Sequence, residues 1–138
     1  MPGHSLPELV VVLAIMAVLA GLAAPRVAHA VDVAAVHSAS HVVASVLAGA
    51  RRAALQRGER VAVVIDSTSG IVRAGPADRP LLVGVIGAAT GAIISASRDS
   101  IAFGPTGLGY GAANTSIIVR RGGAADTVVV SREGRVRG

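Results

Sequence analysis

Two histidines have the spacing of a metal site. His37 and His41 stand four residues apart, so on a helix both imidazoles would lie on one face, and His29 and Asp32 lie about two turns earlier. No glutamate joins the two histidines as it does in the helices of zinc hydrolases. We therefore interpret these residues as part of a polar stripe on a helix, and we predict neither a metal site nor a cofactor.

Other patterns argue against an enzyme. The glycine-rich segment Gly104–Gly111 lacks the Gly-Lys-Ser/Thr ending of a phosphate-binding loop and does not open a predicted helix. All four histidines lie within the first 41 residues, the acidic residues downstream are scattered among predicted turns, and cysteine is absent. No nucleophile can be paired with a base. The sequence therefore predicts a non-enzymatic protein without a disulfide or a thiolate metal site.

Glu8 is the ionisable residue whose position most needs an explanation. It precedes Leu9–Ala24, sixteen residues without a polar side chain, and Leu6 extends the apolar character on its other side. The whole stretch approaches the roughly 20 residues that cross a bilayer as a helix. A carboxylate just inside such a helix is costly unless it has a partner, and it is usually functional. The alternative is that Glu8 lies at the interface and reaches the lipid headgroups.

Arginines gather near the C-terminus. The tail carries five arginines and two acids, Arg120, Arg121, Arg132, Arg135, Arg137, Asp126 and Glu133. In an extended segment Arg135 and Arg137 would point to the same face about 7 Å apart, close to the phosphate spacing of a single strand. The other three arginines could widen this patch. Because no aromatic residue lies nearby to stack on bases, we predict at most weak, salt-sensitive nucleic-acid binding, and a solvated edge strand is the simpler interpretation.

A long helix must position these groups. The apolar run ends at Pro25, which should kink the helix, and helical periodicity then resumes to about Arg57, with Gly58 as the C-cap. The second half has an apolar stripe of Val36, Val43, Leu47, Ala50 and Ala54, opposed by a polar stripe of Ser38, His41, Ser45, Arg52 and Gln56. It should therefore pack one face against a small domain.

The rest of the chain has strand composition. Short β-branched segments are separated by turn residues at 60–66, 71–74, 81–86, 92–96, 100–103, 116–120, 127–131 and 134–136. We expect a loop over 104–114 and a hairpin turn about 122–126. The predicted fold class is α+β: a long N-terminal helix, kinked near Pro25, packed on a small antiparallel β-sheet or sandwich.

The N-terminal residues resemble a known signal. Gly3-His4-Ser5-Leu6-Pro7-Glu8-Leu9, followed by the apolar run and Pro25, is similar to the class III signal of type IV pilins and type II secretion pseudopilins, whose pattern is Gly-Phe-Thr-Leu-x-Glu-Leu. The resemblance implies that a prepilin peptidase cuts between Gly3 and His4 and methylates the new amine of His4. It also implies that Glu8 pairs in a filament with the amine of a neighbouring subunit, so that neither charge is alone in an apolar medium.

Two features depart from this pattern. His4 stands where phenylalanine is usual, and the leader Met1–Gly3 carries no basic residue, whereas leaders in this family are commonly basic.

A rival interpretation is a conventional signal peptide with Ala28-His29-Ala30 as its cleavage site. That interpretation would make the protein a soluble exported binding module.

The resemblance extends beyond the helix. Ala50–Gly58 leading into Val61–Ile65, together with Ile101–Phe103, Val128–Ser131 and Gly134–Arg137, is similar to the GspH/FimT group. The resemblance implies a minor pseudopilin of type II secretion. The alternative within the family is a minor pilin of a type IV pilus, some of which bind DNA through a C-terminal Gly-Arg-x-Arg element, here Gly134–Arg137.

These expectations divide the chain into four parts. Residues 1–3 would be the leader, 4–25 the transmembrane and filament-core helix, 26–58 its amphipathic second half, and 59–138 a periplasmic β domain. The implied partners are other pilin or pseudopilin subunits, the prepilin peptidase and the membrane, with nucleic acid a weaker expectation. The implied location is the bacterial inner membrane, with one membrane pass and the C-terminal domain in the periplasm.

Overall fold

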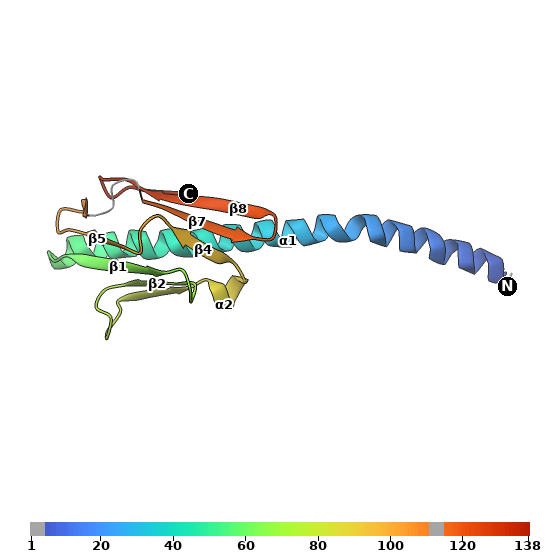
Figure 1. Ribbon diagram of the computed structural model, residues 1–138, viewed down its shortest axis with the longest axis horizontal. Helices are drawn as coiled ribbons and strands as arrows, with labels where there is room; N and C mark the ends of the chain where they lie inside the picture. Colours follow the sequence, from blue (N-terminus) through green and yellow to red (C-terminus); the bar gives the residue numbers. More distant parts are fainter. Residues whose placement is uncertain (1–4, 111–114) are drawn as a thin grey trace.

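The computed structural model describes residues 5–110 and 115–138, so Gly3 and His4 lie outside the described residues. One long helix, α1 (Leu6–Arg57), protrudes from a β domain that wraps its second half (Figure 1). Its 52 residues correspond to a rod of about 78 Å. The predicted α+β architecture is confirmed.

The helix α1 continues through Pro25. Proline there lacks one backbone donor and crowds the preceding turn, and the protruding part of α1 bends relative to the packed part (Figure 1). The helix ends at Arg57, and its C-cap Gly58 adopts the left-handed conformation with φ 65°. A side chain would be strained in that conformation, so the predicted glycine C-cap is confirmed.

Two antiparallel sheets make up the β domain. The first has the strand order β3-β2-β1-β5-β6 and the second the order β4-β7-β8-β9. The strands are β1 (Val61–Asp66), β2 (Ile71–Ala74), β3 (Leu82–Val85), β4 (Ile93–Ala96), β5 (Ser100–Phe103), β6 (Gly109–Tyr110), β7 (Thr115–Arg121), β8 (Ala124–Val130) and β9 (Val136–Arg137). A four-residue helix, α2 (Gly87–Thr90), connects β3 to β4 across the two sheets.

The core lies between α1 and both sheets. Every residue of the predicted apolar stripe is buried, and every residue of the predicted polar stripe is exposed. The opposing sheets contribute alternate residues of their strands, and Phe103, Ile65 and Ile117 are among the largest fully buried side chains. Because the only aromatic ring in this core belongs to Phe103, β-branched and small side chains fill the rest of it.

Three local expectations were inaccurate, and one short helix was missed. The segment 104–114 contains the short strand β6, and α2 was not predicted at all. The turn between β7 and β8 consists of Gly122 and Gly123 rather than residues 122–126, because β8 already begins at Ala124. The last strand begins at Val136 rather than Gly134, since Gly134 adopts the left-handed conformation of a turn with φ 71°.

Candidate functional site

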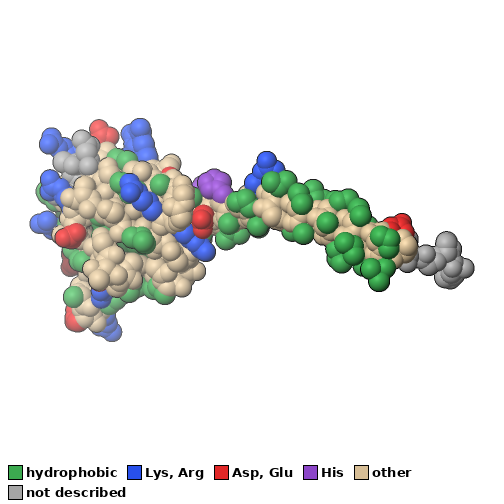
Figure 2. Space-filling model, turned by 45° about the vertical axis from the view of Figure 1, so that its right-hand side comes forward, with side chains coloured by type: hydrophobic (Ala, Val, Ile, Leu, Met, Phe, Trp, Pro, Cys, Tyr) green, Lys and Arg blue, Asp and Glu red, His purple; other side chains and the backbone are tan. Residues whose placement is uncertain are grey.

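The protruding half of α1 carries most of the exposed large hydrophobic side chains among the described residues. Every residue from Ser5 to Val31 is exposed. Figure 2 shows that hydrophobic side chains cover most of the visible face of the protruding rod, whereas most of the charged ones lie on the β domain. Within the described residues, α1 is the one helix long and apolar enough to cross a membrane. A helix that is apolar on all sides and unburied needs a membrane or neighbouring helices to cover it.

Glu8 lies in the first turn of this helix and is exposed. Backbone N–H groups are unpaired at a helix N-terminus, so a carboxylate there is electrostatically favourable. The structure thus places the Glu8 carboxylate at the tip of an apolar rod.

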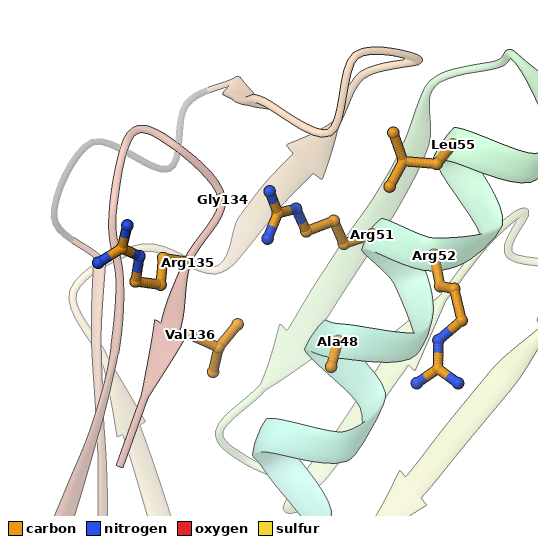
Figure 3. Close-up of a pocket in the computed structure, with 7 residues that line it drawn as sticks. All are labelled: Ala48, Arg51, Arg52, Leu55, Gly134, Arg135 and Val136. Atoms are coloured by element: carbon orange, nitrogen blue, oxygen red, sulfur yellow. The ribbon is translucent and has the colours of Figure 1, made fainter.

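A second candidate site lies at the far end of α1. Arg51 donates its Nε–H to the carbonyl oxygen of Gly107 at 3.0 Å, and Gly134 packs against the same two groups. Beside them lies a groove of about 360 Å³, lined by Ala48, Arg51, Arg52, Leu55, Gly134, Arg135 and Val136 (Figure 3). Arg51 extends from α1 toward the turn that carries Gly134, whereas Arg135 turns its guanidinium away from the helix (Figure 3).

The arginines predicted to bind nucleic acid are partly brought together. Arg135 and Arg137 line a second hollow of about 280 Å³ with Glu133, and the Arg135 Nη2 lies 3.7 Å from the Glu133 carboxylate. Arg132 is exposed on the same turn. The ion pair offsets part of the positive charge that an anionic ligand would meet.

Arg120 and Arg121 do not widen this patch, contrary to the sequence-based expectation. Arg120 pairs with Ala125 at one end of β8, whereas Arg137 pairs with Val129 near the other end, four residues or about 13 Å along the strand. Arg121 is held elsewhere: its Nε lies 3.1 Å from the carboxylate of Asp32, and its Nη1 donates to the carbonyl oxygen of Thr90 at 2.6 Å.

Sequence reasoning did not predict that the arginines of α1 meet the C-terminal tail. The sequence indicates Arg52 only as part of the polar stripe of the helix, and it predicts no role for Arg51. The structure instead places them in one groove with Arg135. This proximity comes from the way the sheets wrap the helix, and no local pattern encodes it.

The histidines of the packed half lie on the exposed stripe, as expected. The Nε2 atoms of His37 and His41 are 3.2 Å apart, and the rings meet edge to face with centroids 4.5 Å apart. Across the described parts of the chain, no group of three or more His, Asp or Glu side chains is arranged to hold a metal ion.

Comparison with known proteins identifies the family of this chain. The family model described as "Type II transport protein GspH" matches residues 39–134, most of the chain. The chain belongs to the GspH family. Comparison of this GspH-family chain with curated proteins gave no match.

Solved structures support the fold of this GspH-family protein. Two crystal forms of the type IV minor pilin FimU from Pseudomonas aeruginosa are similar to it. The P21 form has a TM-score of 0.65 at 14% identity and covers 74% of this chain and 86% of FimU, and the P65 form has 0.63 at 13%, covering 73% and 90%. The pilin-like fold and the family membership agree that the chain is a minor pilin or pseudopilin, a structural subunit whose apolar helix is suited to membrane anchoring.

Proposed function

We propose that this protein is a minor pseudopilin of a type II secretion system. The GspH family match over residues 39–134 carries the proposal. The exposed segment Leu9–Ala24, which has no polar side chain, supports it, because such a rod can serve first as a membrane anchor and then as part of a filament core. The β domain then lies on the periplasmic side of the inner membrane.

The N-terminal signal supports processing before assembly. In this proposal a prepilin peptidase cuts between Gly3 and His4 and methylates the His4 amine. Glu8 then accepts the cationic amine of a neighbouring subunit, which neutralises both charges within the apolar core and fixes the axial register. In this proposal Pro25, which lies inside α1, causes the bend between the membrane half of the helix and the half packed on the sheets.

Mutation of Glu8 tests the assembly mechanism. Glu8→Ala should insert into membranes like the natural protein, because the apolar run is intact, yet be recovered far less in sheared filaments. Glu59→Ala, an exposed glutamate just beyond the helix, is the matched control and should assemble normally. Normal assembly of Glu8→Ala would refute the pairing mechanism.

Sequencing the mature N-terminus tests the processing step. An N-terminus at His4, carrying one methyl group, supports the proposal. A start at Val31 would instead identify a conventional signal peptide and a soluble exported module.

The secretion role is tested by deleting the gene. Loss of extracellular enzymes with normal twitching would support a type II pseudopilin, and the natural gene should restore secretion. Loss of twitching with normal secretion would overturn the assignment in favour of a type IV minor pilin.

Nucleic-acid binding is the second candidate function. The groove that Arg51, Arg52 and Arg135 line favours it. Arg135 lines both hollows, one of them with the helix arginines Arg51 and Arg52 and the other with Arg137. Such binding should weaken steeply with salt, since phosphate contacts release counterions. The double variant Arg135→Ala/Arg137→Ala should lower affinity for single-stranded DNA, while unchanged affinity would exclude this tail as the site.

A further inference from the structure

We propose that His37 and His41 form a two-histidine site for a divalent transition-metal ion, Zn²⁺ in the first place, on the exposed face of α1. The proposal rests on the relative placement of the two rings and does not depend on the secretion role. The sequence showed only the four-residue spacing, from which no metal was predicted. The structure adds the distance between the two nitrogens that would bind the ion.

The separation of the two nitrogens suits a shared metal ion. The Nε2 atoms lie 3.2 Å apart, at hydrogen-bond distance, and the tautomers of the two rings decide which one donates its N–H to the other. Two imidazole nitrogens on one tetrahedral zinc, each about 2.05 Å from the metal, are separated by about 3.3 Å. A metal ion bound to both rings therefore requires little change in the separation of the two nitrogens, and the rings turn until both lone pairs point at it.

The helix holds the two rings in this arrangement. Residues four apart project from neighbouring turns on the same face, and this part of α1 is fixed because Val36 and Val43, on its other side, are buried in the core. The backbone positions that place the two nitrogens near each other are therefore fixed before the metal arrives. Pre-organisation reduces the entropy that binding must offset.

The surroundings are open and favour a cation. Both imidazoles are exposed, so a bound ion can complete its coordination with water. His37 also borders a hollow of about 380 Å³ that it shares with Asp126 and His29. A carboxylate in the same hollow makes the local potential more favourable for a divalent ion.

The ligand chemistry selects the class of ion. Neutral imidazole suits zinc, copper and nickel, whereas Mg²⁺ and Ca²⁺ prefer oxygen ligands. Binding requires the deprotonated ring, so protons compete with the metal and acid should release it.

Titration of the full chain in detergent with ZnCl₂ tests the site. Calorimetry should show one ion bound per chain in the natural protein. Removing even a second-shell partner of a metal site costs about 10- to 100-fold in affinity, so His37→Asn and His41→Asn should each weaken zinc binding by at least that much. Both side chains are exposed, so the variants should fold, and unchanged circular dichroism checks this.

The matched control is His29→Asn, which alters the neighbouring hollow but leaves the pair intact. It should keep zinc affinity within about threefold of the natural chain, since it removes no ligand. Zinc should also shift the Nε2 resonances of His37 and His41 in ¹⁵N spectra, and MgCl₂ should not. Equal zinc affinity in His37→Asn and the natural chain, or loss of affinity in His29→Asn alone, would overturn the proposal.

Discussion

Arg51 and Gly107 are joined by a hydrogen bond of 3.0 Å across 56 residues of sequence, from the Nε–H of the helix arginine to a loop carbonyl oxygen. Gly134 adopts a φ of 71°, and a Cβ atom at this position would collide with that same carbonyl and crowd the Arg51 Nε. The Gly107 carbonyl oxygen thus lies at the point where α1, the loop after β5 and the turn before β9 meet. The glycine of the Gly134–Arg137 element therefore has a structural role of its own, separate from any ligand.

Gly134→Ala should destabilise the fold. The left-handed conformation costs an ordinary residue about 1–2 kcal/mol, and displacing Gly107 and Arg51 adds to that cost. We expect a loss of about 2–3 kcal/mol in the free energy of unfolding, measured by denaturant titration. Gly123→Ala is the matched control, because a Cβ there meets no other atom within 4 Å. Equal stability of the two variants would contradict the role assigned to Gly134.

The ion pair between Arg121 and Asp32 should contribute measurably to stability. It joins α1 to β7 at 3.1 Å with both side chains partly buried, and Arg121 also donates to α2 through the Thr90 carbonyl. A double-mutant cycle with Arg121→Ala and Asp32→Ala should give a coupling of about 0.5–1 kcal/mol that decreases at high salt.

The pair Arg135–Glu133 is the matched comparison for this cycle. Its atoms are 3.7 Å apart and both side chains are largely exposed. Solvent screening should reduce its coupling to nearly zero. A coupling as large as that of Arg121 and Asp32 would show that burial does not determine the strength of these pairs.

The helix could be predicted because its pattern is local. Val36, Val43 and Leu47 recur at helical spacing, and the structure buries all three against the sheets. The C-cap followed from Gly58 alone, since glycine accepts the left-handed conformation. These features depend on neighbours within a few residues, so the sequence contains them directly.

The strand β8 shows why other features could not be predicted. Its first residues, Ala124 to Asp126, have low β propensity, yet they form a ladder with Val119 to Arg121 across the Gly122–Gly123 turn. Pairing with a strong neighbour outweighs local preference. The groove that joins Arg51 and Arg135 arises in the same way, from contacts between segments far apart in the chain.

Ser40→Ala should stabilise the protein. Ser40 lies in α1 and is 4% exposed, and within the described residues its Oγ has no hydrogen-bond partner. Alanine removes a buried polar group without a partner and is the better helix former, so we expect a gain of about 1 kcal/mol. In the control Ser45→Ala, the lost hydroxyl is exposed and donates to the Val42 carbonyl at 2.8 Å. A thermal unfolding midpoint that falls in Ser40→Ala would contradict the expectation.

Asp66 should make stability depend on pH in acid. Its carboxylate accepts the Ser69 hydroxyl at 2.6 Å and the backbone N–H groups of Ser69 and Thr68 at 3.1 and 3.0 Å, and these bonds lower its pKa below the ordinary value of 3.8. Because the unfolded chain binds the proton at a higher pH than the folded one, the contribution of the Asp66 carboxylate to the free energy of unfolding is complete above about pH 4 and disappears as the pH falls through the folded-state pKa.

Asp66→Ala should therefore be less stable than the natural chain at pH 7, and the difference in free energy of unfolding should close in stronger acid. Asp78→Ala, in the exposed loop after β2, serves as the control with little effect at either pH. A difference for Asp66→Ala that stays constant down to pH 2 would show that these hydrogen bonds do not depend on the charge.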